Sequence, residues 1–107
     1  MLEGIKVIDC ASFIAGPAST TIMADFGADV IKIESPGRGD PYRNSVSAGP
    51  TDGDLPAQWT LDNRNKKGLA LDLKTPEGLD VLYRMVEQAD VFVTNMPFPV
   101  RKRLRIQ

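Results

Sequence analysis

The sequence predicts an α/β fold in which an open parallel sheet carries flanking helices. Two strand–helix–strand units follow one another along the chain, and consecutive units of this kind join parallel strands through right-handed crossovers. The strands are short β-branched or apolar runs, which is typical of a sheet covered on both faces. By length the chain is one domain, residues 1–107.

The first unit contains expected strands at residues 6–9 and 30–33, with a helix between them. Pro17 fits the first helical position, because its missing N–H would be unpaired there, and Gly27 fits the left-handed residue that ends a helix. The N–H groups after Gly16 then face the carboxyl edge of the sheet, where ligands bind and a helix N-terminus favours anions. Gly16, Pro17 and Gly27 are equally well explained as residues that start and end a helix, without any ligand role.

A long loop follows the second expected strand and extends to Gln58. Loops of this length inside a compact domain are usually functional or disordered. The polar residues 63–67 come next, and we interpret them as a solvated loop rather than a binding patch, because cations are common on loops. Glycine and proline punctuate the long loop at Pro36, Gly37, Gly39, Pro41, Gly49, Pro50, Gly53 and Pro56.

The second unit contains the most clearly signalled helix. Thr75 fits its N-cap and Pro76 its first helical position. Strands are expected on either side, at residues 69–73 and 91–93. One face of this helix is expected to pack on the sheet, because apolar residues recur at helical spacing at Leu79, Leu82, Tyr83 and Val86.

After the last expected strand the regular pattern stops. Residues 96–100 are expected to be extended, and the chain reaches Gln107 without a capping residue or closing element. The four cations in residues 101–105 fit either a solvated end or half of an anion site. The pattern therefore predicts a chain that is cut off before its fold is complete.

Composition excludes several functional classes. The 13 Lys and Arg residues balance 14 Asp and Glu residues, so the overall charge favours neither nucleic acid nor a membrane surface as a partner. No segment is apolar for long enough to cross a bilayer, and the N-terminus lacks a secretory signal. The lone Cys10 fits a small buried residue in a cytoplasmic protein. The absence of histidine excludes His-containing triads and His-ligated metal sites, so no metal is expected.

Three short segments are expected to meet at the carboxyl edge of the sheet. They are the turn at residues 15–17, the residues after Leu71, and the pair Asn95 and Met96. With Lys74 and the cations of residues 101–105, they describe a crevice suited to a phosphate-bearing ligand. A dinucleotide fingerprint and a Walker loop are both absent.

Three aspartates are candidate carboxylates for chemistry, but none is assigned a catalytic role. Two of them lie within or just after expected strands, where they can simply bond to loop backbone. No partner that would shift a carboxyl pKa is visible in the sequence for any of them, namely Asp9, Asp40 and Asp72.

Several segments, in order over nearly the whole chain, together resemble the N-terminal part of the class III CoA-transferases. This family includes formyl-CoA transferase, the carnitine CoA-transferase type and the α-methylacyl-CoA racemases. The matching segments are residues 2–9, 15–17, 24–34, 36–40, 63–67, 71–78 and 89–91.

The resemblance implies a Rossmann-like domain that binds coenzyme A as a substrate, without a prosthetic group. It also implies a homodimer of interlocked subunits, with an acyl-CoA and a carboxylic acid as partners. This sequence departs from the family pattern at residues 96–99 and at Ser35, where Arg38 can supply the charge. The residues that match family positions holding CoA are Phe13, Ile14, Ala15, Leu71, Asp72, Leu73, Lys74, Asn95, Met96 and Arg103, with Arg38 in addition.

The resemblance also bears on the reaction. In the transferases an aspartate attacks the acyl-CoA thioester, and covalent catalysis splits a difficult acyl transfer into two easier steps. In the racemases a histidine and an aspartate exchange the proton α to the thioester. Both sets of groups lie outside the matched region, so we expect no catalytic residue in this chain. The resemblance favours the CoA-binding part of a CoA-transferase. A fragment of a racemase-type enzyme, a non-catalytic nucleotide-binding module and a chain that folds poorly by itself remain the alternatives.

Overall fold

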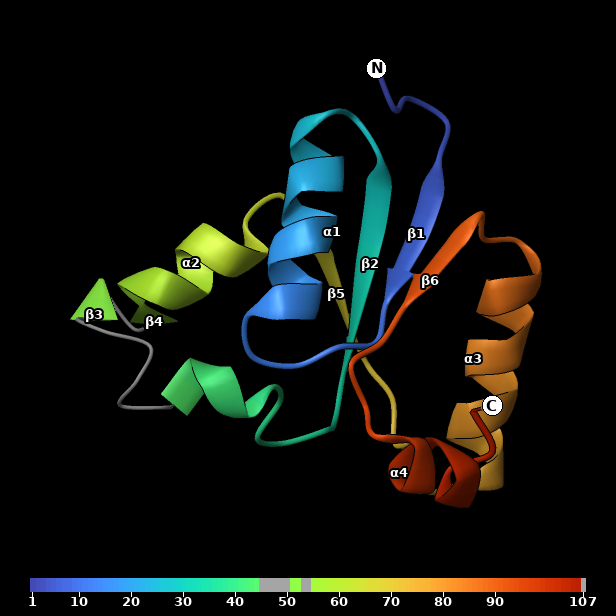
Figure 1. Cartoon of the computed structure of the whole chain (residues 1–107). Coiled ribbons are helices and arrows are strands. Elements are labelled where there is room, and N and C mark those ends of the chain that lie inside the picture. The colour runs from blue at the N-terminus through green and yellow to red at the C-terminus, as the bar shows by residue number, and fades with distance from the viewer. Residues whose placement is uncertain (45–50, 53–54, 107) are drawn as a thin grey trace.

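The computed structural model describes residues 1–44, 51–52 and 55–106. Its centre is a four-stranded sheet in the order β5-β2-β1-β6, in which every neighbouring pair is parallel. The predicted open parallel sheet is therefore confirmed (Figure 1). The strands are β1 (Lys6–Asp9), β2 (Asp29–Glu34), β5 (Lys67–Ala70) and β6 (Val91–Val93).

Helices connect the parallel strands of the sheet. Helix α1 (Ala15–Asp25) joins β1 to β2, and α3 (Pro76–Glu87) joins β5 to β6. The remaining elements are the 3-10 helix η1 (Pro41–Asn44), the antiparallel pair β3 (Thr51–Asp52) and β4 (Leu55–Pro56), α2 (Ala57–Asn63) and α4 (Phe98–Arg103). Figure 1 shows η1 and α4 near the end of the sheet to which the parallel strands point.

Two apolar clusters cover the two faces of the sheet. Alternate strand residues point to opposite faces, so neighbouring residues of one strand fall into different clusters. On the α1 side the cluster contains Val7, Ala24, Ala28 and Val30, with Val91 and Val93 packed against it. On the α3 side it contains Ile8, Cys10, Ile33, Leu82 and Ile106. This double coverage explains why neighbouring residues of β1 and β2, such as Val7 and Ile8, are both apolar.

Several predicted helix signals are confirmed. Gly27 has a φ of 104°, the left-handed conformation expected after α1. Thr75 caps α3, because its Oγ1 accepts a hydrogen bond from the Gly78 N–H at 3.1 Å. Helix α1, however, begins at Ala15, two residues before the predicted first position at Pro17.

Three sequence-based expectations are wrong. Strand β5 occupies residues 67–70, so residues 71–73 belong to the loop that follows it. Within residues 96–100, the segment from Phe98 onward is helical, because Pro99 fits the first turn of α4. The predicted long loop contains η1 and the start of α2, although its Gly49, Pro50 and Gly53 lie outside the described residues, as does Gln107.

No helix within the described parts of the chain has the length and apolar character required to span a membrane.

Gly78 offers a direct test of how closely α3 approaches the chain before it. A Cβ at Gly78 would lie 2.1 Å from the Asp72 carbonyl oxygen. We expect Gly78→Ala to lower the free energy of unfolding by about 1–3 kcal/mol despite the better helix propensity of alanine. Gly68 is the matched control, because a Cβ there meets nothing within 4 Å, and Gly68→Ala should change stability by less than about 0.5 kcal/mol. Equal urea-unfolding curves for the two variants would contradict this packing.

Candidate functional site

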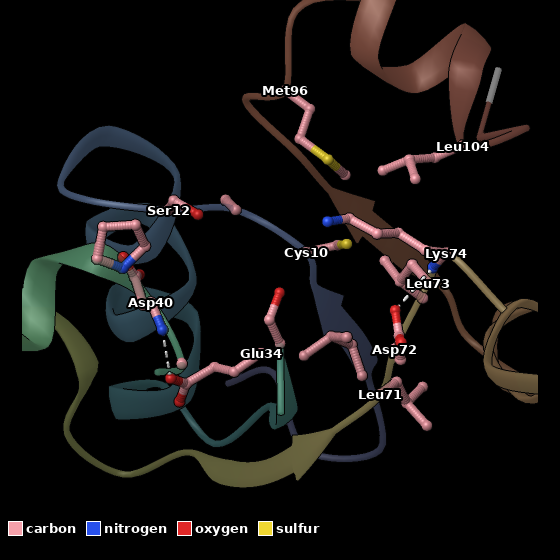
Figure 2. A pocket seen from close by; sticks show the side chains of 15 residues that line it. Cys10, Ser12, Glu34, Asp40, Leu71, Asp72, Leu73, Lys74, Met96 and Leu104 are labelled. Atoms are coloured by element: carbon pink, nitrogen blue, oxygen red, sulfur yellow. Dashed lines mark hydrogen bonds between the residues drawn. The ribbon is translucent and has the colours of Figure 1, made fainter. Parts of the chain in front are cut away.

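A pocket with a volume of about 150 Å³ lies at the carboxyl edge of the sheet. All four strand ends contribute to it, including β2, whose contribution the sequence analysis missed (Figure 2). The lining residues are Cys10, Ala11 and Ser12 after β1; Ile33, Glu34, Ser35, Gly39, Asp40 and Pro41 around the end of β2; Leu71, Asp72, Leu73 and Lys74 after β5; and Met96 and Leu104 after β6.

The pocket lies where the order of the strands changes direction. From β1 the chain proceeds to β2 and β5 on one side, and β6 then returns to the other side of β1. In open α/β sheets this switch point is where ligands bind. Beside this switch point, Asn95 binds the backbone of the loop after β1. Its Oδ1 accepts from the Ser12 N–H at 3.0 Å, and its Nδ2 donates to the Ser12 carbonyl at 2.7 Å.

The loop between β1 and α1 has an unusual backbone. Phe13 has a φ of 65°, a conformation that costs a non-glycine residue about 1–3 kcal/mol. The next residue, Ile14, is the N-cap of α1, and its side chain makes no capping hydrogen bond. Gly16 allows the start of α1 to lie close to the loop after β1, since a Cβ there would lie 2.4 Å from that of Ala11. The first turn of α1 thus keeps backbone donors without a side-chain cap.

Lys32 and Asp40 form a buried ion pair beside this loop. The Lys32 Nζ lies 3.0 Å from Asp40 Oδ2, and the two side chains are 3% and 1% exposed. Lys32 also donates to the Ala11 carbonyl at 2.9 Å, while the Asp40 carboxylate accepts from the N–H groups of Phe13 and Tyr42. Asp40 therefore has a partner that the sequence did not reveal.

Glu34 and Arg43 form a second ionic contact at the rim of the pocket. Arg43 Nε and Nη2 each donate to the Glu34 carboxylate at 2.8 Å, and the guanidinium lies 4.0 Å from the centre of the Trp59 ring. Burial acts to raise the pKa of Glu34, but the hydrogen bonds from Arg43 and the Asp40 N–H outweigh it. The pKa of Glu34 consequently lies below its ordinary value.

Asp9 and Lys66 form another buried pair, beneath α1. Their charged atoms are 2.7 Å apart, and the side chains are 0% and 2% exposed. Lys66 also donates to the Pro17 carbonyl at 2.8 Å, and Thr20 donates to Asp9 at 2.6 Å. Burial lowers the pKa of Lys66, although the hydrogen bond to Asp9 acts in the opposite direction. The interpretation of residues 63–67 as a solvated loop is therefore wrong for Lys66, and Asp9 too has a partner.

A larger groove of about 660 Å³ adjoins the pocket and shares Leu73, Lys74 and Leu104 with it. Its other lining residues are Thr75, Pro76, Leu79, Arg103 and Arg105. The groove thus lies between the start of α3 and the end of α4, with three cationic side chains along it. Figure 2 shows Lys74 extending into the pocket from the loop after β5.

The predicted ligand residues are distributed around these two hollows. Leu71, Asp72, Leu73, Lys74 and Met96 line the pocket, and Arg103 lines the groove. Phe13, Ile14 and Ala15 follow the lining residue Ser12 directly, without lining the pocket themselves. Arg38 lines a further hollow beside Gly68, which shares Glu34, Ser35 and Gly39 with the pocket. Asn95 uses its amide to bind Ser12. Of the three segments expected to meet, Met96 and the residues after Leu71 line the pocket, whereas the turn at residues 15–17 does not.

Cys10 lies in the pocket wall but is 6% exposed. Burial raises the pKa of its thiol to about 11, and the nearby Asp9 carboxylate adds to the shift. A thiol of this kind carries little thiolate at neutral pH, so Cys10 fits a small apolar core residue, as expected.

Comparison with known proteins identifies the family. The model of CoA-transferase family III matches residues 2–107. The chain belongs to CoA-transferase family III.

Three similar proteins are named as CoA-transferases. The (R)-2-hydroxy-4-methylpentanoate CoA-transferase of Clostridioides difficile is 38% identical over 99% of this chain and 27% of its own length. The cinnamoyl-CoA:phenyllactate CoA-transferase of Clostridium sporogenes is 45% identical over 89% of this chain and 23% of its own. The formyl-CoA:oxalate CoA-transferase of Escherichia coli is 43% identical over 88% of this chain and 22% of its own.

A solved structure of a CAIB/BAIF family protein from Brucella suis has the same fold. It superposes with a TM-score of 0.88 and 32% identity, covering 99% of this chain and 28% of that one. The chain therefore spans about a quarter of the length of the relatives it matches. It corresponds to their N-terminal part, as the sequence resemblance indicated.

The lowered pKa of Glu34 predicts how this region responds to acid. The ionised carboxylate stabilises the fold above the ordinary pKa of 4.5, and this contribution is lost as the pH falls through the lower folded-state pKa. We expect Glu34→Gln to lower the free energy of unfolding by about 1–2 kcal/mol near neutral pH, since a charged hydrogen bond is weakened. The difference from wild type should shrink as the pH falls below 4.5.

Urea unfolding at neutral and acidic pH measures this difference. Glu87→Gln, at an exposed glutamate of α3, is the control and should stay within about 0.5 kcal/mol of wild type at each pH. A Glu34→Gln effect that is the same at both pH values would contradict an ionic contribution.

Proposed function

We propose that this chain is the CoA-binding part of a class III CoA-transferase. The enzyme would move CoA between an acyl-CoA and a carboxylic acid. The observation that carries the proposal is the cationic groove that adjoins a partly apolar pocket at the switch point of the sheet, in a chain of CoA-transferase family III. CoA itself is substrate here, and no prosthetic group is part of the proposal.

The two hollows differ in a way that suits the two ends of CoA. The groove carries Lys74, Arg103 and Arg105, and cationic side chains bind phosphate oxygens through charge-assisted hydrogen bonds. The adjoining pocket is walled by Leu71, Met96 and Leu104, among others, which suits a narrow, largely uncharged pantetheine arm. We therefore place the nucleotide over the groove and direct the arm toward the pocket.

The loop before α1 is proposed to contribute through its backbone. Residues 13–15 match the family positions that hold CoA, and α1 begins there without a side-chain cap. Backbone N–H groups at such a helix start favour negatively charged or carbonyl oxygens. Phe13 and Ile14 are 44% and 52% exposed, so their side chains are accessible to a ligand lying across the loop.

The chemical step is proposed to use groups outside this chain. None of the three candidate aspartates is proposed as the nucleophile. Asp9 and Asp40 are held in buried ion pairs, and Asp72 accepts a hydrogen bond from the Lys74 N–H. We propose that the remaining part of the enzyme supplies the nucleophilic aspartate and the acyl and acceptor sites. We also propose that the whole enzyme is a cytoplasmic homodimer of interlocked subunits.

Titration of the chain with CoA tests this function. We expect CoA to bind more tightly than ATP, because the pantetheine arm adds contacts in the pocket. Lys74→Ala and Arg103→Ala should each weaken CoA binding about 3–10-fold by removing a cation that faces phosphate. Isothermal titration calorimetry at two salt concentrations measures the effect, which should diminish at high salt.

Matched control variants distinguish specific contacts from overall charge. Lys67→Ala removes a 74% exposed lysine at the amino end of β5, and Arg84→Ala removes a 78% exposed arginine on the outer part of α3. Neither lines the pocket or the groove, so both should bind CoA like wild type. Equal affinities for CoA and ATP, or equal losses in the test and control variants, would contradict the proposed site.

A further inference from the structure

We propose that Lys32 and Asp40 act as a positioning pair that presets the loop between β1 and α1 for ligand binding. The proposal rests on the CoA site proposed above and deepens it, because it names the side chains that hold the ligand-facing loop in place. Neither side chain is proposed to touch the ligand. Both act through the backbone of residues 11–13.

The first observation is the conformation of Phe13. Its φ of 65° lies in the left-handed region, which large L-residues rarely adopt without support. Phe13 directly precedes Ile14, the N-cap of α1, so its conformation sets the direction in which the helix starts. The Phe13 N–H donates to Asp40 Oδ1 and Oδ2 at 3.2 and 3.3 Å, which supplies that support.

The second observation is that the Asp40 carboxylate is fully engaged within the protein. Oδ2 faces Lys32 Nζ at 3.0 Å, and Oδ1 accepts from the Tyr42 N–H at 2.9 Å. The side chain is only 1% exposed, although Asp40 belongs to the pocket wall (Figure 2). A carboxylate with these partners is suited to holding the Phe13 backbone and not to binding substrate. Lys32 also balances its charge in the wall of the pocket proposed for the pantetheine arm.

The third observation is that the pair holds the loop at two points. Lys32 Nζ donates to the Ala11 carbonyl at 2.9 Å, while Asp40 accepts from Phe13 two residues later. Between them, Ser12 is bound from the other side by both amide atoms of Asn95. The loop is thus fixed between the ends of β2 and β6, and its conformation depends on contacts distant in sequence.

The test replaces both members of the pair at once. Lys32→Met with Asp40→Ala leaves no lone buried charge, and pairs removed together are tolerated far better than single partners. Calorimetric titration with CoA should show binding weakened about tenfold, because the free loop adopts the binding conformation only part of the time. A second variant, Lys32→Met with Asp40→Asn, keeps a carbonyl acceptor for the Phe13 N–H and should stay within about threefold of wild type.

The Phe13→Gly substitution distinguishes positioning of the loop from a general effect of the pair on the fold. Glycine reaches a φ of 65° without support, so the pair should matter less in a Phe13→Gly background. We expect the Lys32→Met, Asp40→Ala change to weaken CoA binding about tenfold when Phe13 is present but less than about threefold in the Phe13→Gly background. The CoA affinity of the Phe13→Gly variant serves only as the reference for the variant that carries Lys32→Met, Asp40→Ala and Phe13→Gly together. The same loss in both backgrounds would overturn the proposal.

Amide hydrogen exchange in the ligand-free chain makes the test independent of CoA. Removal of the pair should speed exchange about tenfold at Ser12 and Phe13, whose N–H groups donate to Asn95 and Asp40. Amides of α3 around Leu82 should keep their protection and report an intact fold. Lys67→Met with Asp29→Ala removes an exposed pair at the opposite edge and should alter neither readout. Unchanged exchange at Ser12 and Phe13 would overturn the positioning role. A wild-type chain that fails to bind CoA would instead overturn the proposed function.

Discussion

Two buried ion pairs beneath the carboxyl edge of the sheet are the interactions on which the site depends. Asp9 and Lys66 join β1 to the segment between α2 and β5, and Lys32 and Asp40 join β2 to the loop after β1. Loss of one partner from such a pair typically costs about 3–5 kcal/mol, because an uncompensated charge remains buried. The pairs therefore tie the first unit of the fold to later parts of the chain and hold the pocket wall in one arrangement.

The geometry of the proposed CoA site follows from this framework. The strand order changes direction beside β1, so the ends of β1 and β6 lie side by side and Asn95 can bind Ser12 across them. Close backbone approach at Gly16 and Gly78 brings α1 and α3 against the chain segments beside the pocket. The rigid part of the site is thus backbone held by buried side chains, while the cations of the groove, such as Lys74 and Arg103, remain exposed and free to meet a ligand.

Predictions from the sequence were confirmed for features that depend on neighbouring residues. The N-cap at Thr75, the left-handed Gly27 and the strands β1, β2 and β6 depend on residues within one turn or one strand, so the sequence shows them directly. The assignment of Lys66 to a solvated loop failed because burial of a lysine depends on a distant partner. Its carboxylate, Asp9, is 57 residues away in the chain. The helical Phe98–Arg103 segment was missed because two nearby prolines favoured an extended conformation.

The sequence by itself determined the α/β class, the parallel sheet and the family, because hydrophobic periodicity, helix caps and the order of short motifs are properties of neighbouring residues. It also indicated that the residues after Leu71 and the pair Asn95 and Met96 lie near the end of β1. Only the tertiary structure decided that β2 joins the pocket, that Asn95 bonds to backbone, and that Asp9 and Asp40 are neutralised by lysines. These features arise from contacts between residues far apart in the chain, which exist only once the sheet has brought its carboxyl ends together.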